Sequence, residues 1–291
     1  MLPFEFVVPY SLEEALSLLS PDDPEVRPVG GATAIMLMMK AGVLSPSRLV
    51  SLRNIEARYS STRINEKGEL VIGGLARLKD LEHNSDVRRG WPMLTRALRT
   101  HSNVRVRAVA TVGGNLAHAD PHMDLPPVMA ALGARITIAG ARSGLRTVPA
   151  DSFCTGYYET VLARDELIVG VTVPPQPSAG TYMKITTRAA HDWPALGLAL
   201  VFDNEGGHVR RPSIMAGAAT DRPTRLAAAQ RVLEGVSVDD DEALERAGDA
   251  AAQEIDIVGD THGSAAYKRH LLKVTLTRAV RLAANTARTA Q

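Results

Sequence analysis

Two Gly-Gly pairs, roughly eighty residues apart, constrain this chain more than any other feature of its sequence. The first lies in residues 29–33 (VGGAT) and the second in residues 111–115 (TVGGN), and each follows an apolar or alternating stretch. We therefore expect each pair to lie in a loop that leaves a strand. Glycines allow positive φ values and a close approach of the backbone to a ligand, and their N–H groups can bind phosphate oxygens. The two loops predict that the diphosphate of a flavin or nicotinamide dinucleotide is held from two sides.

Composition excludes several other classes of protein. The chain has 291 residues, of which 45% are apolar, as in an ordinary globular protein large enough for two or three subdomains. Its 33 Lys and Arg balance 32 Asp and Glu, and without a basic surplus nucleic-acid binding has no support. The single cysteine, Cys154, excludes an iron–sulfur cluster held by cysteines of this chain.

The sequence indicates a soluble, cytoplasmic protein without membrane insertion. Its first residues lack the basic and apolar regions of a secretory signal. The longest apolar stretch, residues 32–39, is interrupted by Thr33 and is too short to cross a bilayer.

The first 176 residues alternate between helix and strand patterns. Residues 11–19 predict a helix with a capping box at Ser11 and Glu14, and residues 94–101 show the i, i+3, i+4, i+7 spacing of another. Asp124 is expected to cap a helix that ends at Gly133. A helix is also expected over 34–40, and strands over 26–29, 48–53, 70–72, 104–109, 135–139 and 167–173.

A proline-rich linker at residues 174–177 separates a region of different character. Strands are expected over 182–188, 195–203 and 208–217, and Ala-rich helices over 222–234, 240–254 and 264–287. A run of strands followed by a run of helices indicates a separate α+β domain.

No GxGxxG or GxxxxGK[ST] motif is present, so neither a Rossmann fingerprint nor a P-loop explains the Gly-Gly pairs. Instead, the chain resembles the FAD-binding medium subunit of molybdenum hydroxylases, the carbon monoxide dehydrogenase and xanthine dehydrogenase family. The most specific stretch runs from Ala110 to Ala117, continues through Asp120-Pro121 and ends in residues 124–127. The resemblance also rests on residues 29–33, 153–160, 165–168, 182–184, Arg188 and 264–269.

The resemblance implies an α+β fold in two parts. Residues 1–176 would form a p-cresol-methylhydroxylase-type FAD-binding domain with two α+β subdomains, at about 1–56 and 57–176. Residues 177–291 would form a C-terminal domain of a three-stranded antiparallel sheet and helices.

The resemblance also implies which residues bind FAD. Residues 27–34 would wrap one side of the diphosphate and residues 111–115 the other, while Asp124 would bind ribityl or sugar hydroxyls and Lys184 would reach the isoalloxazine edge. No residue is expected to be catalytic or to bind a metal in this chain. The full set is Arg27, Pro28, Val29, Gly30, Gly31, Ala32, Thr33, Ala34, His101, Thr111, Val112, Gly113, Gly114, Asn115, Asp120, Asp124, Ile168 and Lys184.

The function implied by the resemblance is electron transfer. The FAD would take electrons from [2Fe–2S] clusters on a small partner subunit, after oxidation of the substrate at a molybdenum–pterin cofactor on a large one. The assembly would be a dimer of heterotrimers, and the FAD would reduce an external acceptor. Two alternatives stay open at this point, namely a self-sufficient FAD oxidoreductase of the same fold and a cofactor-free scaffold subunit.

Two smaller features have competing interpretations. The spacing of His118, Asp120 and His122 could suggest a metal site, but we favour solvated loop histidines. Tyr157 and Tyr158 could shield a flavin or simply pack.

Overall fold

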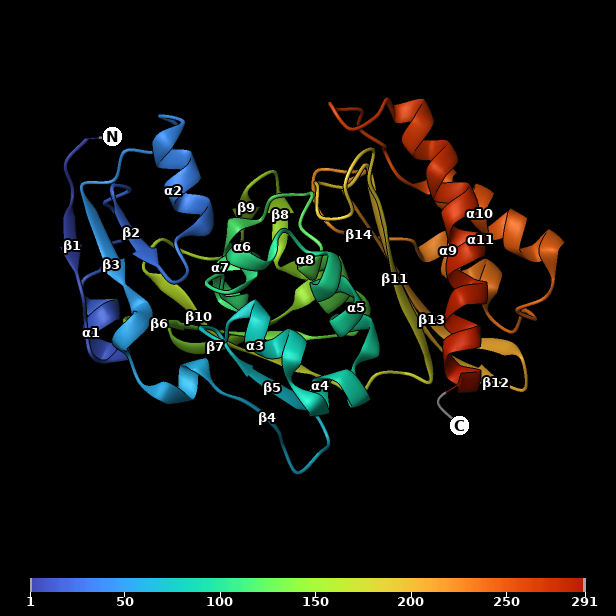
Figure 1. Ribbon diagram of the computed structural model, residues 1–291, viewed down its shortest axis with the longest axis horizontal. Helices are drawn as coiled ribbons and strands as arrows, with labels where there is room; N and C mark the ends of the chain where they lie inside the picture. The colour runs from blue at the N-terminus through green and yellow to red at the C-terminus, as the bar shows by residue number, and fades with distance from the viewer. Residues whose placement is uncertain (1, 290–291) are drawn as a thin grey trace.

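The computed structural model describes residues 2–289. Figure 1 shows three regions side by side: a small N-terminal sheet with β1, β3 and β2, a central sheet with short helices, and a C-terminal sheet covered by α9, α10 and α11. The mixed α and β architecture, with a C-terminal antiparallel sheet and helices after the first two regions, confirms the predicted α+β class.

The N-terminal sheet is parallel, in the order β1–β3–β2. Ser11 caps α1 by accepting a hydrogen bond from the Glu14 N–H at 3.1 Å, as expected from the capping box. The first Gly-Gly pair directly follows β2 and leads into α2, which ends before Gly42 at φ 71°. The elements are β1 (Glu5–Val7), α1 (Leu12–Ser17), β2 (Val26–Val29), α2 (Thr33–Lys40), β3 (Arg48–Ser51), η1 (Leu52–Asn54) and η2 (Ala57–Ser60).

The central sheet is antiparallel, in the order β4–β5–β10–β6–β7, and six short helices belong to the same region, of which α7 contacts β5 and β10. Its strands are β4 (Thr62–Ile64), β5 (Leu70–Gly73), β6 (Arg135–Gly140), β7 (Gly144–Pro149) and β10 (Glu166–Val173), with η3 (Ala150–Ser152), β8 (Cys154–Gly156) and β9 (Glu159–Thr160) between them. Its helices are α3 (Leu78–His83), α4 (Ser85–Gly90), α5 (Pro92–Thr100), α6 (Val104–Arg107), α7 (Val112–His118) and α8 (Leu125–Ala131).

The prediction of a strand over residues 104–109 is wrong. Residues 104–107 form α6, because the Asn103 side chain accepts hydrogen bonds from the Arg105 and Val106 N–H groups and caps a helical turn. A capping asparagine overrides a short period-two pattern, since alternation over six residues carries little free energy of its own. The second Gly-Gly pair therefore does not leave a strand but lies in the first turn of α7.

The C-terminal sheet contains the three expected strands and a fourth, two-residue strand, in the order β11–β12–β13–β14. The prolines at 174–177 connect it to β10. The elements are β11 (Ala179–Ile185), β12 (Leu196–Glu205), β13 (His208–Gly217), β14 (Thr224–Arg225), α9 (Ala227–Leu233), α10 (Asp241–Glu254) and α11 (Ala265–Thr289).

The central and C-terminal regions share a hydrophobic core. Tyr182, Ala199, Val201 and Met215 of the C-terminal sheet pack into the same cluster as the central helices, with α8 against β12 and β13 and α5 against β11. This packing places the loop at residues 119–124 directly between the two regions. Among the described residues, no helix is long and apolar enough to cross a membrane.

Candidate cofactor-binding site

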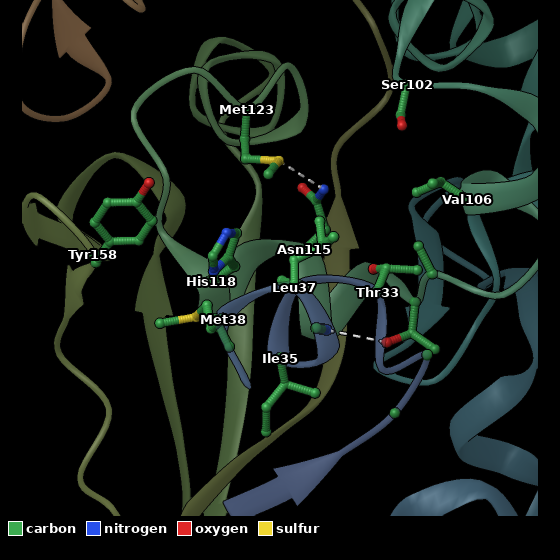
Figure 2. A pocket seen from close by; sticks show the side chains of 18 of the residues that line it. Thr33, Ile35, Leu37, Met38, Ser102, Val106, Asn115, His118, Met123 and Tyr158 are labelled. Atoms are coloured by element: carbon green, nitrogen blue, oxygen red, sulfur yellow. Dashed lines mark hydrogen bonds between the residues drawn. The ribbon is translucent and has the colours of Figure 1, made fainter. Parts of the chain in front are cut away.

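A cavity of about 1300 Å³ lies where the three regions meet. All but two of the residues predicted to bind FAD line it, although their positions span most of the sequence. The exceptions are Val112 and Asp120, which are buried behind its wall. Figure 2 shows Thr33, Ile35 and Leu37 of α2 on one side of this space, with Asn115 and Met123 on another.

The first Gly-Gly loop presents free backbone donors. Ala32 adopts a left-handed conformation at φ 58° and begins α2 without a side-chain cap. The N–H groups of residues 31–35 donate no hydrogen bond to any described residue, whereas the Met36 N–H bonds to the Ala32 carbonyl. The positive end of α2 is thus an open site for an anion such as a diphosphate.

The second Gly-Gly loop differs from the prediction, because its N–H groups are already used. The Val112 and Gly113 N–H groups donate to the Ala76 and Gly74 carbonyls at 2.9 and 2.7 Å. The Thr111 hydroxyl accepts from Gly114 at 3.1 Å, and the Thr111 carbonyl accepts from Asn115 at 2.9 Å. This loop therefore contributes shape and the Asn115 side chain to the cavity, rather than a row of free donors.

The glycines are needed for close packing rather than for positive φ, which none of the four adopts. A Cβ on Gly31 would lie 2.1 Å from the Val109 carbonyl oxygen, and one on Gly30 would lie 2.8 Å from the Thr111 hydroxyl. A Cβ on Gly113 would lie 2.8 Å from the Gly74 carbonyl oxygen. The two loops thus touch each other, and only glycine permits this contact.

Asp124 is the centre of a buried polar group, which we call the Asp124 group. Its Oδ1 accepts from the Tyr182 hydroxyl at 2.7 Å, and its Oδ2 accepts from the Lys184 ammonium at 3.0 Å and from His101 Nδ1 at 2.9 Å. The side chains of Asp124, His101 and Lys184 are 3%, 8% and 5% exposed. Asp124 sits at the N-cap position of α8 but makes no capping bond, because its carboxylate is fully engaged elsewhere.

The hydrogen bonds of this group fix the roles of its members. His101 Nε2 lies 3.2 Å from the Asn115 amide nitrogen, so it accepts that bond while Nδ1 donates to Asp124. Lys184 also donates to the Thr100 carbonyl at 3.0 Å, which leaves one of its three N–H donors for a ligand. Burial, together with the Asp124 charge, raises the pKa of Tyr182 well above its usual range.

Two buried polar atoms of the cavity wall have no partner in the described part of the chain. These are the Asn115 amide oxygen and Arg27 Nε. Native proteins rarely leave such atoms unpaired, so each is suited to a bound ligand: the amide oxygen to a hydroxyl or ring N–H, the guanidinium to a phosphate. With the open end of α2, these atoms form a donor and acceptor set that fits a flavin dinucleotide.

Tyr182 was missing from the predicted site. It lies two residues before Lys184 on β11, so both side chains point to the same face of that strand, a relation that the strand period could have suggested. Met123 was missing too: its sulfur accepts a bond from the Asn115 amide at 3.3 Å, drawn dashed in Figure 2. Ile168 lies on β10 beside Gly74, where a Cβ would be 2.1 Å from the Ile168 carbonyl oxygen.

A second polar group surrounds Asp120, and we call it the Asp120 group. Asp120 accepts hydrogen bonds from His122 and Tyr158, and His122 continues to Asp260, which binds Lys268. The expectation of solvated histidines is wrong for His122, whose side chain is 14% exposed. No group of three His, Cys, Asp or Glu in the described residues has a geometry that could hold a metal ion.

Family comparisons agree with this architecture. Residues 2–176 match the family described as the FAD binding domain in molybdopterin dehydrogenase, and residues 181–283 match the CO dehydrogenase flavoprotein C-terminal domain. The first match covers more than half of the chain.

Individual relatives align over nearly their whole length. The glyceraldehyde dehydrogenase medium chain of Sulfolobus acidocaldarius is 32% identical over 272 residues, which are 93% of this chain and 95% of that one. The carbon monoxide dehydrogenase medium chain of Hydrogenophaga pseudoflava is 30% identical over 97% of this chain and 98% of its own. The solved carbon monoxide dehydrogenase from the same organism superposes with a TM-score of 0.92, at 30% identity and 98% and 99% coverage. From the loops, the cavity and these matches together, we conclude that the chain belongs to the molybdopterin-dehydrogenase family of FAD-binding proteins and is a flavin-dependent oxidoreductase component of the medium-chain type.

Proposed function

We propose that the chain is the FAD-binding medium subunit of a cytoplasmic molybdenum hydroxylase. It would receive electrons from [2Fe–2S] clusters of a small subunit and pass them to an external acceptor, while a large subunit with the molybdenum–pterin cofactor oxidises the substrate. The assembly would be a dimer of heterotrimers. The division into residues 1–176 for FAD and 177–291 for the second domain remains a prediction.

The observation that carries this proposal is the unpaired polar set of the cavity. Residues 31–35 with their free N–H groups, and Arg27 and Asn115 with one unpaired polar atom each, line one space large enough for a dinucleotide. A cavity built only for packing would not concentrate orphan donors at the positive end of a helix.

Bound FAD supplies a ring that accepts and releases electrons, and the residues of this chain bind and orient it. The α2 N-terminus and Arg27 would neutralise the diphosphate. Asn115 and the remaining N–H donor of Lys184 would bind polar atoms farther along the cofactor. Because Asp124 balances the Lys184 charge at 3.0 Å, Lys184 would act mainly as a hydrogen-bond donor rather than as an unbalanced cation.

Electrons must enter from another chain. With Cys154 as its single cysteine, and that one buried, this chain cannot ligate a cysteine-bound cluster. The names of its relatives, medium chains of dehydrogenases, support partners of smaller and larger size.

The test is reconstitution of the full chain with FAD, followed by titration of flavin fluorescence. We expect one FAD per chain, with binding lost in Gly31→Ala, since the added Cβ would separate the two loops. Asn115→Leu removes a hydrogen bond to the cofactor and should weaken FAD binding by about 1–2.8 kcal/mol, or roughly five- to a hundredfold. Gly90→Ala is the matched control, because its added Cβ meets nothing within 4 Å.

A second measurement addresses electron transfer. The chain purified with its native partners should show flavin reduction on addition of the organic substrate, and the isolated chain should not. Flavin reduction by substrate in the isolated chain would establish a self-sufficient oxidoreductase instead. If the chain does not bind FAD under any condition, the result would indicate a cofactor-free scaffold subunit.

A further inference from the structure

His122 connects two carboxylates from distant parts of the chain. Its Nδ1 lies 3.1 Å from Asp120 Oδ1, and its Nε2 lies 2.8 Å from Asp260 Oδ2. A neutral imidazole has one N–H donor, whereas here both ring nitrogens face carboxylate oxygens, which can accept a hydrogen bond but cannot donate one. The geometry therefore requires the doubly protonated, positively charged ring.

The surroundings of His122 balance that charge. The Asp120 side chain is fully buried and also accepts from the Tyr158 hydroxyl at 3.0 Å. Asp260 binds the Lys268 ammonium at 2.6 Å, and the Lys268 side chain is 1% exposed. Two carboxylates thus face two cations. Burial by itself lowers the pKa of His122, but the hydrogen bonds and charges of both aspartates outweigh burial and raise that pKa above 6.5.

Trp193 packs on the same ring. The His122 and Trp193 rings stack with centroids 5.5 Å apart and an interplanar angle of 11°, and His262 packs against both rings. Trp193 lies in the connection between β11 and β12, lines the cofactor cavity and is 50% exposed. A cationic ring against an indole face is an attractive contact.

We propose that His122 is a positioning residue that holds Trp193 at the rim of the cofactor cavity. It does so by joining three segments that are far apart in sequence: the 119–124 loop, the connection with Trp193, and the turn at residues 260–263. Any effect of this arrangement on a bound flavin rests on the function proposed above. The placement of Trp193 by His122 does not depend on that function.

Deprotonation of His122 would release this arrangement. The neutral ring keeps a single donor, so one carboxylate loses its bond and the buried group gains a surplus negative charge. The charged and titratable groups around the ring are Asp120, Tyr158, Asp260, His262 and Lys268, with His118 beyond Tyr158 and His191 and Asp192 beside Trp193. Among these, His122 is the residue whose two ring nitrogens both bind carboxylates.

The experiment is acrylamide quenching of tryptophan fluorescence in the FAD-free full chain. The sequence has two tryptophans, and Trp91 is 3% exposed, so the difference between the wild type and Trp193→Phe reports Trp193. In His122→Gln we expect the quenching constant of Trp193 to rise by up to about two-fold, because half of its surface is covered now. His208→Gln is the matched control and should change it little, since the His208 side chain contacts the Gly206 carbonyl in the turn before β13 and contacts neither carboxylate nor the Trp193 ring. Unchanged quenching in a folded His122→Gln protein would overturn the proposal.

A pH titration provides the second readout. Quenching of Trp193 in the wild type should rise as pH passes the raised pKa of His122. Asp260→Asn keeps the side-chain shape but removes one charge, so it must move this midpoint to lower pH. An unmoved midpoint would also overturn the proposal. Failure of the wild type to bind FAD would count against the proposed function and leave these FAD-free measurements untouched.

Discussion

The Asp124 group and the Asp120 group have similar chemistry but different surroundings. Each places an aspartate of one short loop against a tyrosine hydroxyl and a histidine, and each includes a lysine ammonium. The side chains around Asp124 are almost completely buried, whereas Tyr158 and the stacked Trp193 are about half exposed. The comparison teaches that the same residue types can be enclosed completely, as around Asp124, or can extend to exposed aromatic rings at the rim of the cavity, as around Asp120.

The largest effect is expected from Asp124→Asn. It leaves the Lys184 ammonium buried without a carboxylate, which typically costs about 3–5 kcal/mol of unfolding free energy. Chemical denaturation of the full chain measures this cost. In the double variant with Lys184→Met the loss should shrink, because the unpaired charge is gone. Equal loss in both variants would contradict the assignment of Lys184 as the main partner.

Asp260→Asn tests the outer group with a smaller expected effect. It removes charged hydrogen bonds to His122 and Lys268, a loss of about 1.5–3 kcal/mol. Burial raises the pKa of Asp260, but bonds from Lys268 and His122 outweigh it and hold that pKa at about 2. The contribution is therefore present above pH 3.8 and lost as pH falls through about 2. Acid denaturation curves of the variant and the wild type should converge below that range.

A matched pair of tyrosine substitutions compares the groups directly. Tyr182→Phe removes a buried hydrogen bond to a carboxylate and should cost about 1.5–3 kcal/mol, whereas Tyr158→Phe, at 51% exposure, should cost about 0.5–1 kcal/mol. Thermal unfolding of both variants under one condition measures the difference. Equal costs would show that burial does not separate the two groups.

The smallest effect is a change of stability with pH near neutrality. The pKa of His122 is raised, so its contribution is complete below about 6.5 and is lost as pH rises through the raised value. Denaturation at a series of pH values should show this loss in the wild type and not in His122→Gln. A decline of the same size in the variant would assign it to another group.

Much of the fold could be predicted because its information is local. The Ser11 capping box and the prolines that open α8 both depend on neighbours in sequence. The strand predicted over 104–109 failed through another local feature, the Asn103 cap. The predicted site residues were expected to share one ligand, and all but two of them line one cavity, while their contact with FAD stays a prediction.

The chemistry of the site was less predictable because it depends on distant partners. Two N–H groups of the second loop, those of Val112 and Gly113, are occupied by carbonyls of residues 76 and 74, more than thirty positions away. Asp124 was expected to cap a helix, but Tyr182 and Lys184, 58 and 60 residues further along, take its carboxylate. Periodicity and capping rules cannot reveal such long-range competition for an oxygen atom.

The contact between Gly31 and the Val109 carbonyl limits how such proteins can exchange parts. A chimera that takes its first fifty-six residues from a homologue keeps the cavity only if the incoming loop has no Cβ at this point. By contrast, Phe6 and Tyr10 are 55% and 72% exposed, so substitutions at these two positions should not disturb the contact between the loops. Recombination between relatives should therefore require glycine at the positions of both Gly30 and Gly31, whatever the overall identity of the exchanged segments.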